Sequence, residues 1–167
     1  MWRRSLSEKL PLDFDPLTPR FYARPMTDKS LSDGIAERVR ASFAQQAAMQ
    51  SIGASIVRLA AGEVELTMPY RAELTQQHGF LHAGIVTTLG DSACGYAALS
   101  LMPLGSDVLS VEFKVNLLRP AAGQRFRAVG SVLKSGRTLM VTRGDVWAAQ
   151  DDQEVLIATM LATMIRK

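Results

Sequence analysis

One carboxylate, Asp91, stands in a stretch of the chain that is otherwise small and apolar, HGFLHAGIVTTLGD over residues 78–91. A carboxylate among apolar neighbours costs on the order of several kcal/mol unless a partner compensates it. The local pattern leaves two interpretations open. Asp91 is either a general base or nucleophile kept for chemistry, or an acid on a helix surface that backbone donors satisfy.

The residues that follow His82 predict a helix that carries Asp91 on a small, polar face. At helical spacing, one stripe holds Gly84, Thr88, Asp91, Gly95 and Ala98. The opposite stripe is bulkier and holds Ile85, Leu89, Ser92, Tyr96 and Leu99. Small side chains allow another backbone or a ligand to approach closely. The acid is therefore expected on a side of the helix that is open to a partner.

The start of this helix offers a second chemical group. Residues 79–84, GFLHAG, bring the free backbone N–H groups of a first helical turn next to a glycine-lined loop. Such a terminus binds anions or polarises a carbonyl oxygen. Backbone donors for an oxyanion, together with a carboxylate for a water molecule, indicate acyl hydrolysis.

The other reactive side chains form weaker patterns. His78 and His82 have the i, i+4 spacing of a metal site, but no carboxylate lies between them and no third ligand is evident. We expect them to cap the helix or brace the loop, without a metal. Cys94 lies in mid-helix without a base beside it, so we interpret it as a small core residue.

The segments around this helix predict an α+β fold. An amphipathic helix is expected over 33–50, where Ile35, Val39, Phe43 and Ala47 recur every four residues. Two short strands meet at a turn near residues 61–62, and four strand-like runs follow the central helix. Short links favour antiparallel neighbours. We therefore expect an antiparallel sheet with one long helix buried against it.

The first of the four later runs, LSVEFKVNL over residues 109–117, alternates in polarity along its whole length. A strand with this pattern would place Leu109, Val111, Phe113, Val115 and Leu117 on one face. The other face would hold Ser110, Glu112, Lys114 and Asn116.

The composition sets limits on the function. We expect one domain, residues 32–167, behind an N-terminal extension, residues 1–31, that either wraps a neighbouring subunit or is a mobile tail. The net charge of +3 is below that of a typical nucleic-acid binder but suits an anionic small ligand. A carboxylate in the apolar run 83–102 argues against a membrane span. The single cysteine and the absence of a secretory signal core fit a cytoplasmic location.

From about residue 33 to residue 166, the chain resembles the hotdog-fold acyl-CoA thioesterases of the phenylacetate-degradation (PaaI-like) family. In that family a curled antiparallel sheet wraps a helix that begins with a His-Gly-Gly-type turn, and a catalytic acid follows eight residues later. Here His82-Ala83-Gly84 followed by IVTTLGD puts Asp91 at the position of that acid. The runs SVEFKVNLLRPAAG and VLKSGRTLMV resemble the family's third strand with its Arg-Pro exit and its Gly-Arg hairpin.

The resemblance implies a role for each matching residue. Asp91 would activate the hydrolytic water or attack the thioester directly, and Ser110 would position the water. The Ala83 N–H, in the turn formed with His82 and Gly84, would hold the thioester oxygen. Family sites lie across a dimer interface, with the helix start from one subunit and the acid from the other, and family dimers often pair into tetramers.

Two positions depart from the family pattern, and others are implied to bind substrate. Ala83 replaces the usual first glycine, and Gln76 stands where many relatives carry an asparagine that orients the substrate carbonyl. Positive groups at strand ends and turns are implied to contact the phosphates of coenzyme A: Arg119, Lys134 and Arg137, with Gly136 in the hairpin. Phe80, Leu81, Tyr96 and Met102 either line an acyl pocket or pack in the core.

Three functions remain in order of preference. The first is hydrolysis of a small, medium-chain or aryl acyl-CoA to free acid and CoA, with no cofactor beyond the CoA of the substrate. The second is an acyl-CoA-binding module without catalysis. The third is dehydratase chemistry on the same fold, which would pair His82 with Asp91 across the site.

Overall fold

The computed structural model describes residues 30–151 and 153–167, so the expected N-terminal extension lies almost wholly outside the described residues. Two helices come first, α1 (Asp33–Gln45) and α2 (Ala47–Ile52). Next come strands β1 (Ser55–Ala60) and β2 (Glu63–Pro69), the short helix η3 (Ala72–Leu74) and the long helix α3 (Ala83–Leu99). The chain ends with β3 (Val108–Leu117), β4 (Arg125–Ser135), β5 (Leu139–Gln150) and β6 (Gln153–Arg166). The predicted order of elements is confirmed.

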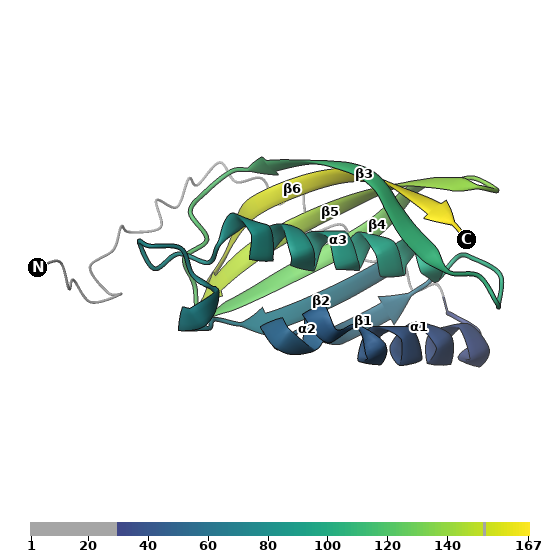
Figure 1. Cartoon of the computed structure of the whole chain (residues 1–167), viewed down its shortest axis with the longest axis horizontal. Helices are drawn as coiled ribbons and strands as arrows, with labels where there is room; N and C mark the ends of the chain where they lie inside the picture. The colour runs from purple at the N-terminus through teal and green to yellow at the C-terminus, as the bar shows by residue number, and fades with distance from the viewer. Residues whose placement is uncertain (1–29, 152) are drawn as a thin grey trace, which may run out of the picture.

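The six strands form one antiparallel sheet in the order β1-β2-β4-β5-β6-β3. The sheet curls around α3, which lies along its inner face, while α1 and α2 lie near β1 (Figure 1). Strands β1 and β3 are its two edges. This arrangement confirms the predicted α+β fold with one central helix. None of the described helices is both long and apolar enough to cross a membrane.

The fit between α3 and the sheet depends on two glycines in the central strands. A Cβ added at Gly130 of β4 would lie 2.2 Å from the backbone carbonyl of Ala93. A Cβ added at Gly144 of β5 would lie 2.8 Å from Cys94 Sγ. Because Ala93 and Cys94 are fully buried, the helix has no room to retreat without opening the core. The two glycines therefore set how closely α3 approaches the sheet.

The helix expected over 33–50 is divided into two at Gln46, whose backbone is extended (φ −79°, ψ 96°). Val39 of α1 and Ile52 of α2 are both buried. In one straight helix these side chains would point about 140° apart, at 3.6 residues per turn. The break at Gln46 turns both segments toward the core, a tertiary requirement that the local periodicity did not reveal.

Arg38 attaches α1 to the end of α3. Its guanidinium donates to the backbone oxygens of Leu99 at 2.6 Å and Met102 at 2.9 Å, and also to that of Pro103. These are carbonyls at or just beyond the C-terminus of α3, where a cation is favourable. Charged hydrogen bonds thus complement the apolar contacts of Val39 in docking α1.

Strand β3 does not follow the simple alternation expected from its sequence. Its pairing with β6 shifts between Ser110 and Glu112, which leaves Val111 as an extra residue. Ser110 is paired with the buried Met164, and Phe113 with the buried Ala162, so both side chains point toward α3. The prediction that Ser110 and Phe113 lie on opposite faces was wrong, because a bulge inverts the alternation at this point.

We predict that Gly130→Ala lowers the free energy of unfolding by about 3 kcal/mol or more, because its methyl group would overlap backbone atoms of α3. Gly95→Ala is the matched control, since a Cβ at Gly95 meets nothing within 4 Å. In a helix this exchange is expected to stabilise by up to about 1 kcal/mol. Urea unfolding followed by circular dichroism measures both changes. Equal stabilities of the two variants would contradict the close packing.

Candidate active site

Asp91 and Ser110 form a hydrogen-bonded pair on the open side of α3. The Ser110 hydroxyl donates to Asp91 Oδ1 over 2.7 Å and lies 3.5 Å from Met164 Sδ. The side chain of Asp91 is half-buried, and its Oδ2 makes no hydrogen bond to the described residues. The carboxylate is therefore held by one neighbour while its second oxygen is available to a water molecule or a substrate.

The start of α3 carries a backbone donor that is not used within the chain. His82 is the N-cap, and its Nδ1 accepts a hydrogen bond from the Gly84 N–H over 2.9 Å. This confirms the expectation that His82 caps the helix. The loop is fixed by the His82 N–H, which donates to Leu74 O over 3.0 Å. The Ala83 N–H has no acceptor among the described residues, so it can donate to a bound oxygen.

Gln76 lies in the same loop and faces the same hollow as Ala83. Its side-chain Oε1 accepts a hydrogen bond from the His78 N–H, and its NH2 group is a donor. The hollow has a volume of about 260 Å³ and is also lined by Phe80, Leu81 and Arg119. Two donors, the Ala83 N–H and the Gln76 amide, thus belong to one concave site.

The acid and the helix-start donor are well separated within one chain. Ala83 and Asp91 are eight positions apart, which corresponds to about 12 Å along the helix axis at 1.5 Å per residue. A carbonyl oxygen bound by the Ala83 N–H is then too far from the carboxylate of the same chain for direct chemistry. The structure therefore brings Asp91 together with Ser110, and Ala83 together with Gln76, at two separate places along α3.

A second cavity, of about 420 Å³, opens beside Asp91 and Ser110. Helix α1, the open face of α3 and the start of β3 form its walls. Tyr96 lines it, with only 6% of its surface exposed and with its hydroxyl 3.4 Å from Gln46 Oε1. From the sequence, Tyr96 was expected either to line an acyl pocket or to pack in the core. Gln46 was not predicted, because only the break between α1 and α2 brings its amide to the cavity. Met102 is fully buried in the core.

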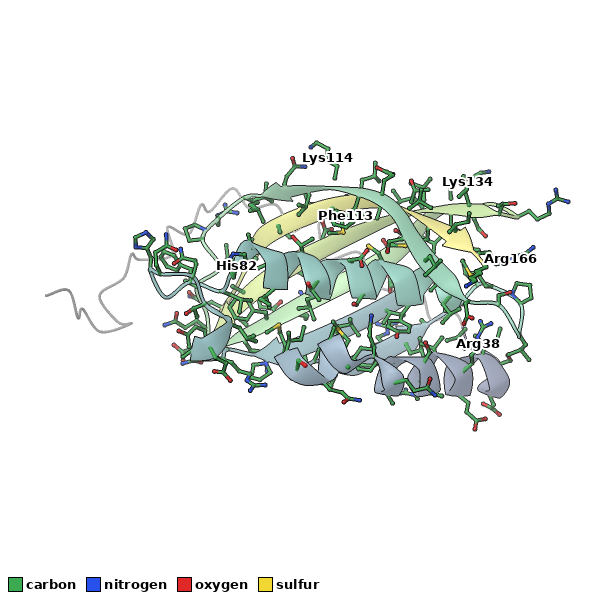
Figure 2. The ribbon with its side chains drawn as sticks, in the orientation of Figure 1. Arg38, His82, Phe113, Lys114, Lys134 and Arg166 are labelled. Carbon is green, nitrogen blue, oxygen red and sulfur yellow. The ribbon has the colours of Figure 1, made fainter. Side chains whose placement is uncertain are left out.

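The basic residues expected to contact CoA lie at two opposite ends of the folded molecule. Arg119 follows β3, lines the hollow at the helix start and donates to Leu156 O over 3.0 Å. Lys134, Gly136 and Arg137 belong to the β4–β5 hairpin at the opposite end. Figure 2 shows His82 at one end of the molecule and Lys134 at the other. Within one chain these residues therefore do not form a single phosphate site.

Cys94 is buried in the core, where its thiol is shielded from solvent. Burial raises the pKa of the Cys94 thiol to about 12, and the Asp91 and Asp145 carboxylates add to the rise while a hydrogen bond with Thr142 opposes it. A thiol that stays protonated is a poor nucleophile. No group of three or more metal-ligating side chains occurs in the described parts of the chain.

Comparison with known proteins identifies the family. Residues 78–155 match the family model of the thioesterase superfamily. A protein of Halobacterium salinarum named "Putative esterase" is 30% identical over 125 residues, which cover 72% of this chain and 82% of that protein. Another with that name, from Saccharolobus solfataricus, is 34% identical over 86 residues, which are 52% of this chain and 61% of that protein. The chain belongs to the thioesterase superfamily, a family of hydrolases.

Solved structures agree with this assignment. A thioesterase family protein from Silicibacter pomeroyi is 56% identical, with a TM-score of 0.78, over 79% of this chain and 97% of that chain. The PaaI protein from the phenylacetic acid degradation operon of E. coli is 24% identical, with a TM-score of 0.74, over 83% and 96% of the two chains. A protein of Bacillus halodurans, whose structure was determined with CoA, is 25% identical with a TM-score of 0.58 over 62% and 66%. The likeness to PaaI confirms the hotdog fold.

We predict that Cys94 does not react with a disulfide reagent in the native protein at pH 8. Its pKa of about 12 keeps the thiol protonated at pH 8, and the side chain is fully buried. Absorbance after addition of the reagent should show no thiol release until the chain is unfolded in concentrated guanidinium chloride, when one thiol per chain appears. Rapid modification of the folded chain would mean that α3 separates readily from the sheet.

Proposed function

We propose that this protein is an acyl-CoA thioesterase of the PaaI-like branch, with Asp91 as the general base. The observation that carries the proposal is the Asp91–Ser110 pair, a partnered but accessible carboxylate at the mouth of a 420 Å³ cavity. The unused Ala83 N–H supplies a donor for the oxygen of a thioester. The CoA found with the Bacillus halodurans relative supports CoA as the leaving group.

Each group has a defined task in this reaction. The thioester oxygen accepts a hydrogen bond from the Ala83 N–H, aided by the Gln76 amide, and charge develops on it as water attacks. Asp91 takes one proton from that water, while Ser110 holds the carboxylate in place and accepts from the water. The C–S bond then breaks, the sulfur takes up the proton, and free acid and CoA leave.

We propose that the working site is shared between two copies of the chain, since about 12 Å along α3 separates the donor from the acid. Edge strand β3 supports such an assembly. Its free backbone groups are a template for pairing with another strand. Val111, Phe113 and Leu117 on this strand are each 45–54% exposed, which is costly for apolar side chains unless a partner covers them. Antiparallel pairing of two β3 strands would bring the helix start of one copy toward Asp91 of the other.

A shared site also joins the two basic regions. The hairpin with Lys134 and Arg137 and the loop with Arg119 lie at opposite ends of one chain. In an antiparallel pair, each end of one copy approaches the opposite end of its partner. The cations can then surround one nucleotide, which is the phosphate contact expected from the sequence.

Asp91→Asn is expected to lower kcat on acyl-CoA substrates by about 100-fold or more, because it removes the base but keeps the shape. Ser110→Ala is expected to have a smaller effect, about 10-fold. Asp145→Asn is a matched control, since Asp145 accepts a hydrogen bond from Thr159 over 2.6 Å on the sheet face away from α3. The release of free CoA, read with a thiol reagent, measures all three.

The same assay separates the alternatives. Tight binding of acyl-CoA without turnover by the wild type would favour the non-catalytic binding module. Turnover that survives in Asp91→Asn would remove Asp91 from the mechanism. Hydration of an enoyl-CoA without release of CoA would favour the dehydratase.

Mixed dimers test whether the site is shared. Ala83→Pro removes the proposed oxyanion donor at the first helical position, where proline is tolerated. The backbone of His82 (φ −61°, ψ 138°) suits a residue before proline. Dimers of either Ala83→Pro or Asp91→Asn alone should be inactive. A mixed dimer, purified through two different tags, should regain about half of the wild-type rate, since one of its two sites is intact. No recovery in a folded mixed dimer would contradict a shared site.

A further inference from the structure

The cavity beside Asp91 has a polar inner wall that the hydrolytic chemistry does not use. Tyr96 is almost fully buried, and its hydroxyl contacts Gln46 Oε1 at 3.4 Å and is hydrogen-bonded with Ser42. The ring packs edge-on against Phe43, with centroids 5.4 Å apart. A phenylalanine would serve that packing equally well. A phenolic hydroxyl has one donor and two acceptor positions, so beside its contacts with Gln46 and Ser42 it keeps one acceptor position for a further partner.

The space between this wall and the acid is open. Gly95 lies on the cavity, and a Cβ there would meet no atom within 4 Å. Asp91 and Tyr96 are five residues apart, which is about 7.5 Å along the helix axis and about 140° around it, and both line the cavity. An extended chain with C–C bonds of about 1.5 Å needs at least about six bonds to cover the axial part of that path. The cavity volume of about 420 Å³ is within the range of small-molecule sites.

The wall suits the end of an acyl group rather than the arm of CoA. The nucleotide of CoA carries several phosphate charges that are costly to bury, so we expect the pantetheine arm to leave toward solvent, whereas an acyl group can end inside the cavity. Helix α1 contributes Ser42 to the cavity, and the break after α1 contributes Gln46. Neither of these side chains nor Tyr96 carries a formal charge at neutral pH, whereas the charged Asp107 and Lys167 line the cavity from the start of β3 and the end of β6. A neutral polar group is the matching ligand.

We propose that Ser42, Gln46 and Tyr96 form a specificity wall. It selects acyl groups that carry an uncharged hydroxyl or carbonyl oxygen at least about six bonds from the thioester carbon. The acyl chain lies along α3 over Gly95, and the oxygen at its end binds the Tyr96 hydroxyl and the Gln46 amide. This inference rests on the proposed thioesterase function, because it assumes that the thioester carbon lies at Asp91.

Two substrates of equal length test the wall, 6-hydroxyhexanoyl-CoA and heptanoyl-CoA, which differ by a hydroxyl in place of a methyl group. The wild type is expected to favour the hydroxylated substrate by about 10-fold in kcat/KM, because the apolar substrate leaves the free acceptor position of the Tyr96 hydroxyl and the Gln46 NH2 group without a partner. Tyr96→Phe and Gln46→Leu should each lower this ratio several-fold. Tyr70→Phe is the matched control, since its hydroxyl contacts Gly79 O outside this cavity, and it should leave the ratio unchanged.

Gly95→Leu provides an independent measurement, because a leucine side chain would occupy the proposed path of the acyl chain. It is expected to lower kcat/KM for both seven-atom substrates by about 10-fold or more relative to propionyl-CoA. Gly95→Ala should produce a smaller change in the same direction. Equal effects on propionyl-CoA and on the longer substrates would show that the acyl chain does not lie in this cavity.

The outcomes separate this inference from the proposed function. Hydrolysis of both seven-atom substrates with the same ratio in the wild type, Tyr96→Phe and Gln46→Leu would overturn the specificity wall and leave the thioesterase intact. If no acyl-CoA is hydrolysed, the proposed function fails. Calorimetric affinities for the same two compounds then test the specificity wall. The wall requires that the wild type binds 6-hydroxyhexanoyl-CoA more tightly than heptanoyl-CoA and that Tyr96→Phe loses this difference.

Discussion

The contact between α3 and the central strands governs the rest of the structure. Gly130 and Gly144 are paired across β4 and β5, and the helix backbone rests where their side chains would be. This close contact fixes both the distance of α3 from the sheet and its rotation about its own axis. With Ala93 and Cys94 against the central strands, Asp91 has to face away from those strands, and it meets Ser110 of edge strand β3. The position of the acid therefore follows from packing on the opposite side of the helix.

The open face of α3 acquires its chemical character from the elements around it. The bulge in β3 brings Ser110 to Asp91 on one side, and the break at Gln46 brings an amide to the cavity on the other. At the helix start, the cap by His82 satisfies the Gly84 N–H and leaves the neighbouring Ala83 N–H unpaired. Irregularities in otherwise regular elements thus place polar groups at the candidate site.

The sequence predicted most of the fold because its signals were local. Alternation in the strands, helical spacing around Asp91 and short links were sufficient for the α+β architecture and the order of elements. The helix break and the strand bulge escaped prediction, since both arise from the need of distant residues to share one core. The packing role of Gly130 and Gly144 was also not predicted, because nothing in the sequence of their own strands indicates that a helix passes within contact distance.

The candidate site was predictable in its parts but not in its geometry. Asp91, His82 and Ala83 stand out by residue type and spacing, and the structure confirms His82 as the cap. Ser110 was expected from the family resemblance, although alternation put it on the same face as Glu112. The cavity wall at Gln46 and Tyr96 depends on how α1 docks on α3, which no short stretch of sequence encodes.

That docking has a consequence for the dynamics of the protein. Helix α1 has one fully buried apolar side chain, Val39, and two partly buried ones, Ile35 and Phe43, and the guanidinium of Arg38 holds it to carbonyls at the end of α3. An element with so little buried surface is expected to open in a sub-global fluctuation while the sheet stays closed. Backbone amides of α1 would then exchange with solvent faster than those of β4 and β5. The wall of the cavity formed by α1 would open and close independently, so that ligands could enter and leave while the sheet stays folded.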